Sequence, residues 1–146
     1  MTLGRTKSVD ILVSDPTNLK MYKLEVKTNY QNSRNKPQVS TVHGKSLSGW
    51  IMNKKHELIN DPDLFYCFVN IGKQTNIFKF YIVPSKIVAK YVKDEHRHWL
   101  VEKERENKNV KDSAMRIFRI GLKGEKYAIS TPTAEQYEDN WEFKQI

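Results

Sequence analysis

The chain has 146 residues, the length of one ordinary domain, and 38% of them are hydrophobic. Its 25 Lys and Arg residues outnumber its 17 Asp and Glu residues, which gives a formal net charge of +8 at pH 7. The sequence contains no run of about 18 apolar residues, which excludes a transmembrane helix. The charge excess favours polyanionic partners, with nucleic acid ahead of an anionic membrane surface. We therefore expect a single domain over residues 1–146 that does not enter a membrane.

The cysteine content and the amino-terminal residues indicate a cellular location. Cys67 is the only cysteine, so an internal disulfide is excluded and a reducing compartment is expected. It lies inside the apolar run at 64–71, which predicts a buried structural thiol rather than a nucleophile. The first ten residues have no apolar stretch of the kind that secretory signals carry. Together these features predict a cytoplasmic protein.

The first elements that the sequence predicts are two strands separated by a turn. Residues 9–15 are rich in β-branched side chains and end at Asp-Pro-Thr-Asn, a strong turn signal. Residues 20–30 alternate between apolar and polar side chains, so this strand has one apolar and one charged face. Residues 31–46 are polar and contain proline and glycine, which predicts an exposed loop with some strand at 38–43.

A predicted helix and two further strands occupy the middle of the chain. The helix is expected at 47–60, because side chains recur there near helical spacing at Leu47, Ile51, Lys54 and Leu58. Residues 64–71 are apolar almost throughout, as a central strand buried on both faces should be. Residues 77–84 then predict the strand that pairs with it. Ser85 is expected to cap a following helix.

The last third of the chain predicts a loop, a strand and a packed tail. Residues 102–113 carry charges of both signs, which is typical of a mobile loop, and 114–120 read as a short strand. An irregular turn should follow. The aromatic side chains of the tail are expected to pack on the body of the domain; they are Tyr137, Trp141 and Phe143. The order of elements predicts an α/β or α+β fold in which helices cover a sheet.

Charged residues in the two first strands need an explanation, because burying an unpaired charge is costly. Glu25 and Lys27 share a strand face, and a hairpin would place Asp10 beside them. Mg²⁺ takes oxygen ligands and keeps several waters, so two carboxylates and the backbone carbonyl of Val26 could hold it. Lys27 could then orient a bound water or stabilise charge on a phosphate. The alternative is a solvent-facing Glu–Lys pair, with Asp10 satisfied by a turn.

An Asp followed one strand later by Glu-x-Lys resembles the signature of the PD-(D/E)xK nuclease superfamily, which has the restriction-endonuclease-like fold. Here the motif is Asp10 and then Glu25-Val26-Lys27. The surroundings, from about residue 4 to residue 119, also resemble a group of small bacterial members of that superfamily. The segments concerned are TKSVDILVSD, LEVKT, SGWIMNKKHEL, LFYCFVNI followed by FYIVPSKIVAKYV, HRHWL and KDSAMRIF.

The resemblance implies an endonuclease that hydrolyses phosphodiester bonds in nucleic acid, DNA in the first instance. Asp10 and Glu25 would hold Mg²⁺ or Mn²⁺ together with the Val26 carbonyl, and Lys27 would complete the catalytic residues. Proteins of this fold usually begin with a helix that precedes the first motif strand and often carries another acid. The sequence reaches Asp10 after only a few residues, which leads us to expect either truncation or another segment or subunit covering that face. Two alternatives stay open: a non-catalytic basic module that binds nucleic acid, and a subunit active only in an oligomer, such as a homodimer, or with a partner.

Several other polar side chains are weaker candidates for contacts with nucleic acid. Those closest in sequence to the motif strand are Gln31, Arg34, Lys36, Lys54 and Lys55. His43 lies in the polar loop and could contact a phosphate. For all of these the competing interpretation is an ordinary solvated surface.

Three further features predict structure rather than chemistry. His96 and His98 do not share a helix face and have no zinc-site spacing, so a partly exposed basic helix end is expected. Trp50 and Trp99 lie within apolar stripes and are predicted core residues. The sequence has no P-loop, dinucleotide fingerprint, nucleophile elbow or Cys-x-x-Cys pair, which gives those enzyme classes no support.

Overall fold

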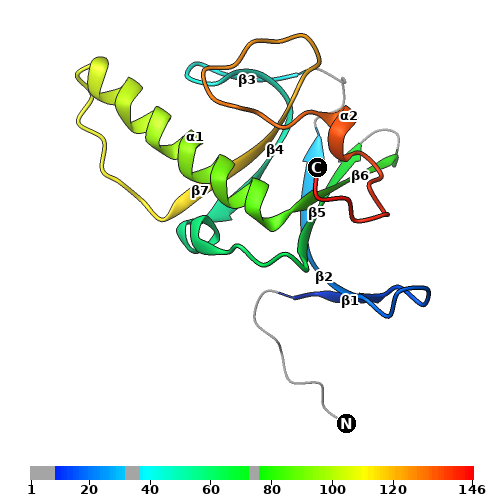
Figure 1. Cartoon of the computed structure of the whole chain (residues 1–146). Coiled ribbons are helices and arrows are strands. Elements are labelled where there is room, and N and C mark those ends of the chain that lie inside the picture. The colour runs from blue at the N-terminus through cyan, green and yellow to red at the C-terminus, as the bar shows by residue number, and fades with distance from the viewer. Residues whose placement is uncertain (1–8, 32–36, 73–75) are drawn as a thin grey trace.

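A computed structural model describes residues 9–31, 37–72 and 76–146 of the chain (Figure 1). It is a mixed α+β fold with two sheets and few helices. The elements, in chain order, are β1 (Ile11–Ser14), β2 (Met21–Gln31), β3 (Gln38–Ser40), β4 (Gly44–Asn53), the 3₁₀ turn η1 (Lys54–Leu58), β5 (Leu64–Gly72), β6 (Phe78–Pro84), α1 (Ser85–Arg105), β7 (Met115–Gly121) and α2 (Ala134–Tyr137).

The larger sheet has the strand order β1-β2-β5-β6. β1 runs antiparallel to β2, and β6 runs antiparallel to β5, whereas β2 and β5 are parallel. The predicted central strand is confirmed as β5, whose first seven residues, Leu64 to Asn70, are all buried. The strands predicted at 9–15, 20–30 and 77–84 are confirmed as β1, β2 and β6, with ends that differ by a few residues.

The second sheet, β3-β4-β7, corrects the prediction of a helix at 47–60. Most of that segment is β4, and the rest is η1. Leu47 and Ile51 are four residues apart, a spacing that fits a helical turn but also places both side chains on one face of a strand. The burial follows the strand period, because Ser48, Trp50 and Met52 are buried while Ile51 is 73% exposed. The pairing of this segment with β7 makes it a strand rather than a helix.

The long helix α1 begins at Ser85, as the sequence predicts, and continues to Arg105. The helix therefore includes the start of the loop predicted at 102–113. Ser85 is not the cap; its Oγ donates to the Asp61 carbonyl at 2.7 Å and accepts from the Asp61 N–H at 3.1 Å, which ties the helix start to the segment before β5. Among the residues described, no helix combines the length and apolar character needed to cross a membrane.

The main hydrophobic core lies between the two sheets and α1. Trp50 is 2% exposed, as predicted for a core residue, and its Nε1–H donates to the Val69 carbonyl at 3.0 Å. Phe68 of β5 stacks on Phe118 of β7 with ring centroids 4.3 Å apart, and Tyr91 of α1 meets Phe118 edge-on. This aromatic stack therefore joins both sheets and the helix.

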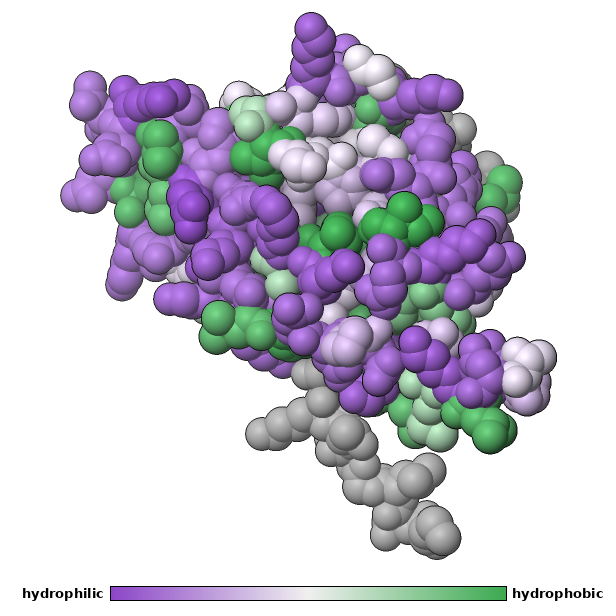
Figure 2. Space-filling model, in the orientation of Figure 1, coloured by the Kyte–Doolittle hydropathy of each residue, from purple (hydrophilic) through white to green (hydrophobic). Residues whose placement is uncertain are grey.

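A smaller core covers the other face of β2 and β5, and the tail closes it. Phe143 stacks on Tyr22 at 4.5 Å, and Tyr137 is buried in the main core, as predicted for the tail. Trp141 contacts Phe80 but stays 47% exposed. Cys67 is buried here, and burial raises the pKa of its thiol to about 11, as expected of a structural rather than a nucleophilic cysteine. Outside these cores hydrophilic side chains predominate on the face in Figure 2.

The aromatic stack predicts a large loss of stability for Phe118→Ala. Deleting a fully buried phenyl ring removes its transfer free energy and leaves a cavity, so the free energy of unfolding should fall by about 3–5 kcal/mol. Urea unfolding followed by circular dichroism measures it. Ile51→Ala, on the exposed side of the same strand pair, should stay within about 0.5 kcal/mol of the wild type. Equal losses for the two variants would contradict this account of the core.

Candidate functional site

The motif strand β2 directs Glu25 and Lys27 to the face that meets the main core. Glu25 stands beside Tyr66 of β5 in the parallel register, and Tyr66 belongs to that core. Glu25 is 5% exposed, and its Oε1 lies 2.6 Å from the Lys27 Nζ. The Lys27 side chain is 27% exposed. The pair therefore runs from the buried sheet face outward to solvent, rather than lying on a solvent-facing strand.

Asp10 lies just before β1, beside the part of β2 that carries Glu25. The register that pairs Ile11 with Leu24 brings Asp10 opposite Glu25. The Asp10 Oδ2 accepts the Val26 N–H at 2.7 Å, and the Asp10 N–H donates to the Leu24 carbonyl at 2.8 Å. Asp10 is thus held by the backbone of β2, not by a turn. Because the N–H and C=O of one strand residue point the same way, the Val26 carbonyl also faces this side.

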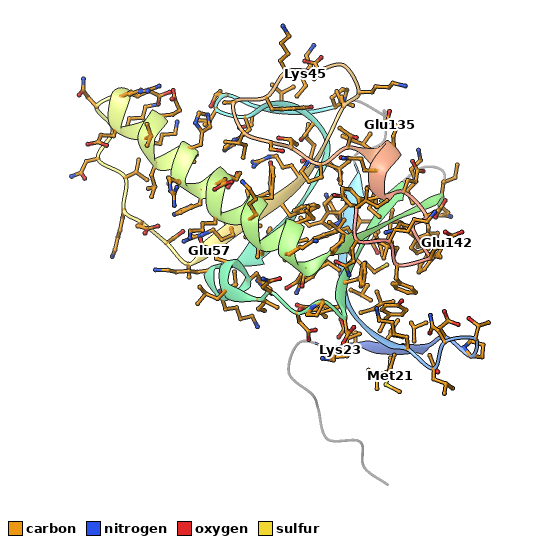
Figure 3. All side chains as sticks on the ribbon, in the orientation of Figure 1. Met21, Lys23, Lys45, Glu57, Glu135 and Glu142 are labelled. Atoms are coloured by element: carbon orange, nitrogen blue, oxygen red, sulfur yellow. The ribbon has the colours of Figure 1, made fainter. Side chains whose placement is uncertain are left out.

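His56 completes the cluster and was not among the residues predicted from the sequence. Its Nε2 lies 3.3 Å from Glu25 Oε1, and its ring is 2% exposed. Its Nδ1 lies 2.9 Å from both the N and the O of Asn53, which caps η1. Asn is a preferred helix-capping residue, but the helix predicted across 47–60 placed no helix start at this point. Figure 3 labels Lys23 on β2 and Glu57 on η1, the segments that carry Glu25 and His56.

The charge on Glu25 reflects two opposing effects. Burial raises the pKa of its carboxyl, but hydrogen bonds and charge from His56 and Lys27 outweigh burial and hold the pKa below the usual 4.5. Both partners approach Oε1. The other oxygen, Oε2, is buried and has no hydrogen-bond partner among the described residues, and the same holds for the Tyr66 hydroxyl. An ionised carboxylate with one unsatisfied buried oxygen is unusual enough to need an explanation.

The oxygen atoms at this place are of the kind that a hard divalent cation takes as ligands. Glu25 Oε2 supplies an unpaired carboxylate oxygen, and the Asp10 carboxylate and Val26 carbonyl belong to the adjoining segment. No group of three or more His, Cys, Asp or Glu side chains that could hold a metal occurs in residues 9–31, 37–72 and 76–146. Mg²⁺ needs only one or two carboxylates when waters fill its remaining positions, so a site for it would rest on this smaller set.

The weaker nucleic-acid candidates divide into those the structure places and those it does not. Lys54 and Lys55 are exposed on η1, immediately before His56, and therefore lie beside the Glu25 cluster. Gln31 is the last residue of β2, and its side chain lies outside what the structure describes. Arg34 and Lys36 also fall outside the described residues.

The structure corrects the predictions for His96 and Trp99, and it gives His43 a partner within the protein. His96 is 8% exposed rather than at an open helix end, and its Nε2 lies 2.7 Å from Asp112 Oδ1. His43 lies in the β3–β4 turn, where its Nε2 is 3.1 Å from Glu95 Oε1, so it is partnered within the protein. Trp99 is only partly buried and stacks against His96. Packing of α1 against the β3–β4 turn produces the His43 contact, and the segment before β7 supplies the partner of His96; sequence spacing reveals neither.

Comparison with known proteins finds no matching family model, no matching curated protein and no matching solved structure. The resemblance in motif therefore stays a prediction.

The buried Glu25 cluster predicts a specific pH dependence of stability. Because the folded-state pKa lies below that of the unfolded chain, ionised Glu25 contributes stability above about pH 4.5 that is lost as the pH falls through the folded value. The free energy of unfolding of wild type minus that of Glu25→Gln should therefore shrink between pH 7 and pH 3. Urea titrations at several pH values measure it. Glu135→Gln, on the surface, serves as the control, and a constant difference for Glu25→Gln would contradict the assignment.

Proposed function

We propose that this protein is a metal-dependent nuclease-like enzyme that hydrolyses phosphodiester bonds in nucleic acid, with DNA as its substrate. One observation carries the proposal: Glu25 Oε2, a buried carboxylate oxygen that no described residue satisfies. It stands beside a partly exposed lysine and across the hairpin from Asp10. The resemblance to the PD-(D/E)xK signature and the net charge of +8 support the same function.

Asp10 and Glu25 would hold Mg²⁺ or Mn²⁺, with the Val26 carbonyl as a third oxygen ligand. Such an ion supplies an activated water and neutralises charge on a phosphate. The role of His56 would be to position Glu25: its contact with Oε1, and its own bonds to Asn53, fix the carboxylate so that Oε2 keeps no partner among the described residues. Ordering of a ligand oxygen by a neighbouring side chain is typical of metal sites.

Lys27 would act on the reacting phosphate. Its ammonium group is held at 2.6 Å by Glu25 Oε1, but more than a quarter of its side chain meets solvent, where a nucleic-acid backbone can approach. Charge on the phosphate grows as the bond to the attacking water forms. A fixed positive group placed there lowers the barrier more than it improves binding of the substrate.

Lys27→Ala should abolish cleavage while leaving oligonucleotide binding nearly intact. Loss of one preorganised electrostatic donor costs about 10²–10³ in rate, whereas one positive charge among 25 Lys and Arg residues contributes little to overall attraction. Cleavage of plasmid DNA and of RNA with Mg²⁺ or Mn²⁺ measures the rate. Asp10→Ala should also abolish cleavage, by weakening metal binding.

Lys126→Ala is the matched control, because it removes one exposed lysine from the turn after β7 and should leave cleavage unchanged. Cleavage that persists unaltered in Lys27→Ala and Asp10→Ala would show that the activity belongs elsewhere. Absence of wild-type cleavage with either metal, together with clear binding, would favour the second candidate function.

That second candidate is a non-catalytic basic module that binds nucleic acid. It is favoured by the contacts of Lys27 and His56 with Glu25, because a carboxylate neutralised from within the protein can serve a purely structural role. In this case only the basic surface would act on the ligand.

Both functions predict that Lys54 and Lys55 contact phosphates. The double variant Lys54→Ala/Lys55→Ala should weaken binding and reduce the slope of log K against log salt concentration by about 0.9 for each lost contact. Fluorescence anisotropy with labelled duplex and single-stranded oligonucleotides at several salt concentrations measures the slope. Lys123→Ala/Lys126→Ala removes the same charge from another exposed segment and should change the slope less. Equal slopes for both double variants would remove η1 from the binding surface.

A further inference from the structure

A cavity of about 160 Å³ lies between α1, the start of β7 and the β3–β4 turn. Its lining includes residues from all three segments and contains none of Asp10, Glu25 and Lys27. It is therefore distinct from the proposed metal site. The volume is that of a single small organic molecule, since an apolar cavity of about 150 Å³ accommodates benzene.

One side of the cavity is a buried charged group. Glu95 of α1 is 4% exposed and forms an ion pair with Arg119 of β7. His43 reaches the same carboxylate oxygen, Oε1, from the β3–β4 turn at 3.1 Å. Burial raises the pKa of the Glu95 carboxyl, but the hydrogen bond of His43 and the charge of Arg119 lower it below its usual range. The carboxylate is thus ionised and its charge is balanced within the protein.

Aromatic and apolar side chains supply part of the remaining lining, beside Ser40, Ser113 and Arg116. Trp99 lines the cavity and stacks against His96, with ring planes 22° apart and centroids separated by 5.7 Å. Met115 and Ile117 of β7 add apolar surface. A stacked aromatic wall beside a carboxylate and a guanidinium offers one flat apolar face and an edge with both acceptors and donors.

We propose that this cavity binds a nucleobase turned out of its strand, and guanine in preference to the other bases. A neutral planar ring matches a site whose charges are already paired, and it can stack on Trp99. The guanine N1–H and amino group would donate to Glu95, while O6 on the same Watson–Crick edge accepts from Arg119. Adenine, cytosine, thymine and uracil do not present two adjacent donors beside a carbonyl acceptor on one edge.

This inference rests on the proposed function for the choice of nucleic acid as the source of the base. It extends that function, because it places a base-reading pocket apart from the phosphate chemistry at Glu25. Binding of a free nucleoside needs neither a metal ion nor cleavage. A test with nucleosides therefore succeeds or fails independently of the nuclease activity.

The experiment is titration of the full chain with guanosine, adenosine, cytidine and uridine, followed by the indole N–H signals in nuclear magnetic resonance spectra. Guanosine should shift the Trp99 signal saturably and most tightly, while the signal of Trp50, deep in the core, stays in place. Glu95→Gln should weaken guanosine binding about 10-fold, the worth of one bidentate contact to a base. Lys27→Ala should bind guanosine as the wild type does, whatever its effect on cleavage.

Ser113→Trp is the second variant, because Ser113 lines the cavity from an exposed loop and a large side chain there fills the space without disturbing Glu95. It should abolish the guanosine effect, and it decides the question if Glu95→Gln fails to fold. Glu135→Gln on the surface is the control and should bind normally. Equal shifts from all four nucleosides, guanosine binding that survives Ser113→Trp, or displacement of guanosine by inorganic phosphate would each overturn the proposal.

Discussion

The parallel pairing of β2 with β5 is the constraint on which the rest of the structure depends. Parallel neighbours cannot be joined by a tight turn, so the chain between Gln31 and Leu64 must leave the sheet and return. It does so through β4 and η1, and this return path lays the second sheet against the first. The same crossover brings His56 over Glu25, so the polar cluster is a product of the topology.

The energetic position of Glu25 follows from this arrangement. Burial at the edge of an aromatic core opposes ionisation of the Glu25 carboxyl. Lys27 and His56, each within 3.3 Å of it, favour the ionised form. Such a buried ion pair is weak evidence for stability, because well-packed apolar side chains in its place often stabilise a fold equally well. An oxygen left unsatisfied costs further free energy. A buried ion pair and an unsatisfied oxygen at the same place both cost free energy. Retaining both is typical of a site selected for chemistry, and this is the physical basis of the function proposed for Glu25 and Lys27.

The sequence predicts β1, β2, β5, β6, β7 and α1 because their signals are local. Alternation identifies β2, an unbroken apolar run identifies β5, and the long helix follows a clear boundary at Pro84. The helix predicted at 47–60 is wrong, because a spacing of four residues fits both a helix and a strand, and only pairing with β7 distinguishes them. The Glu25–His56 contact and the Glu95 network join segments far apart in the chain, and spacing along one sequence does not show which distant segments meet.

The short edge strand β1 has a consequence for how the site responds to fluctuations. β1 has four residues, pairs only with β2 among the described strands, and exposes about half of the Ile11 and Leu12 side chains. Edge segments with so few buried contacts open at a free energy well below that of global unfolding. Opening of β1 would withdraw Asp10 from the Val26 amide while the core around Phe118 stays folded. Amide hydrogen exchange at Val26 would then report the assembly of the Asp10–Glu25 pair separately from the stability of the domain.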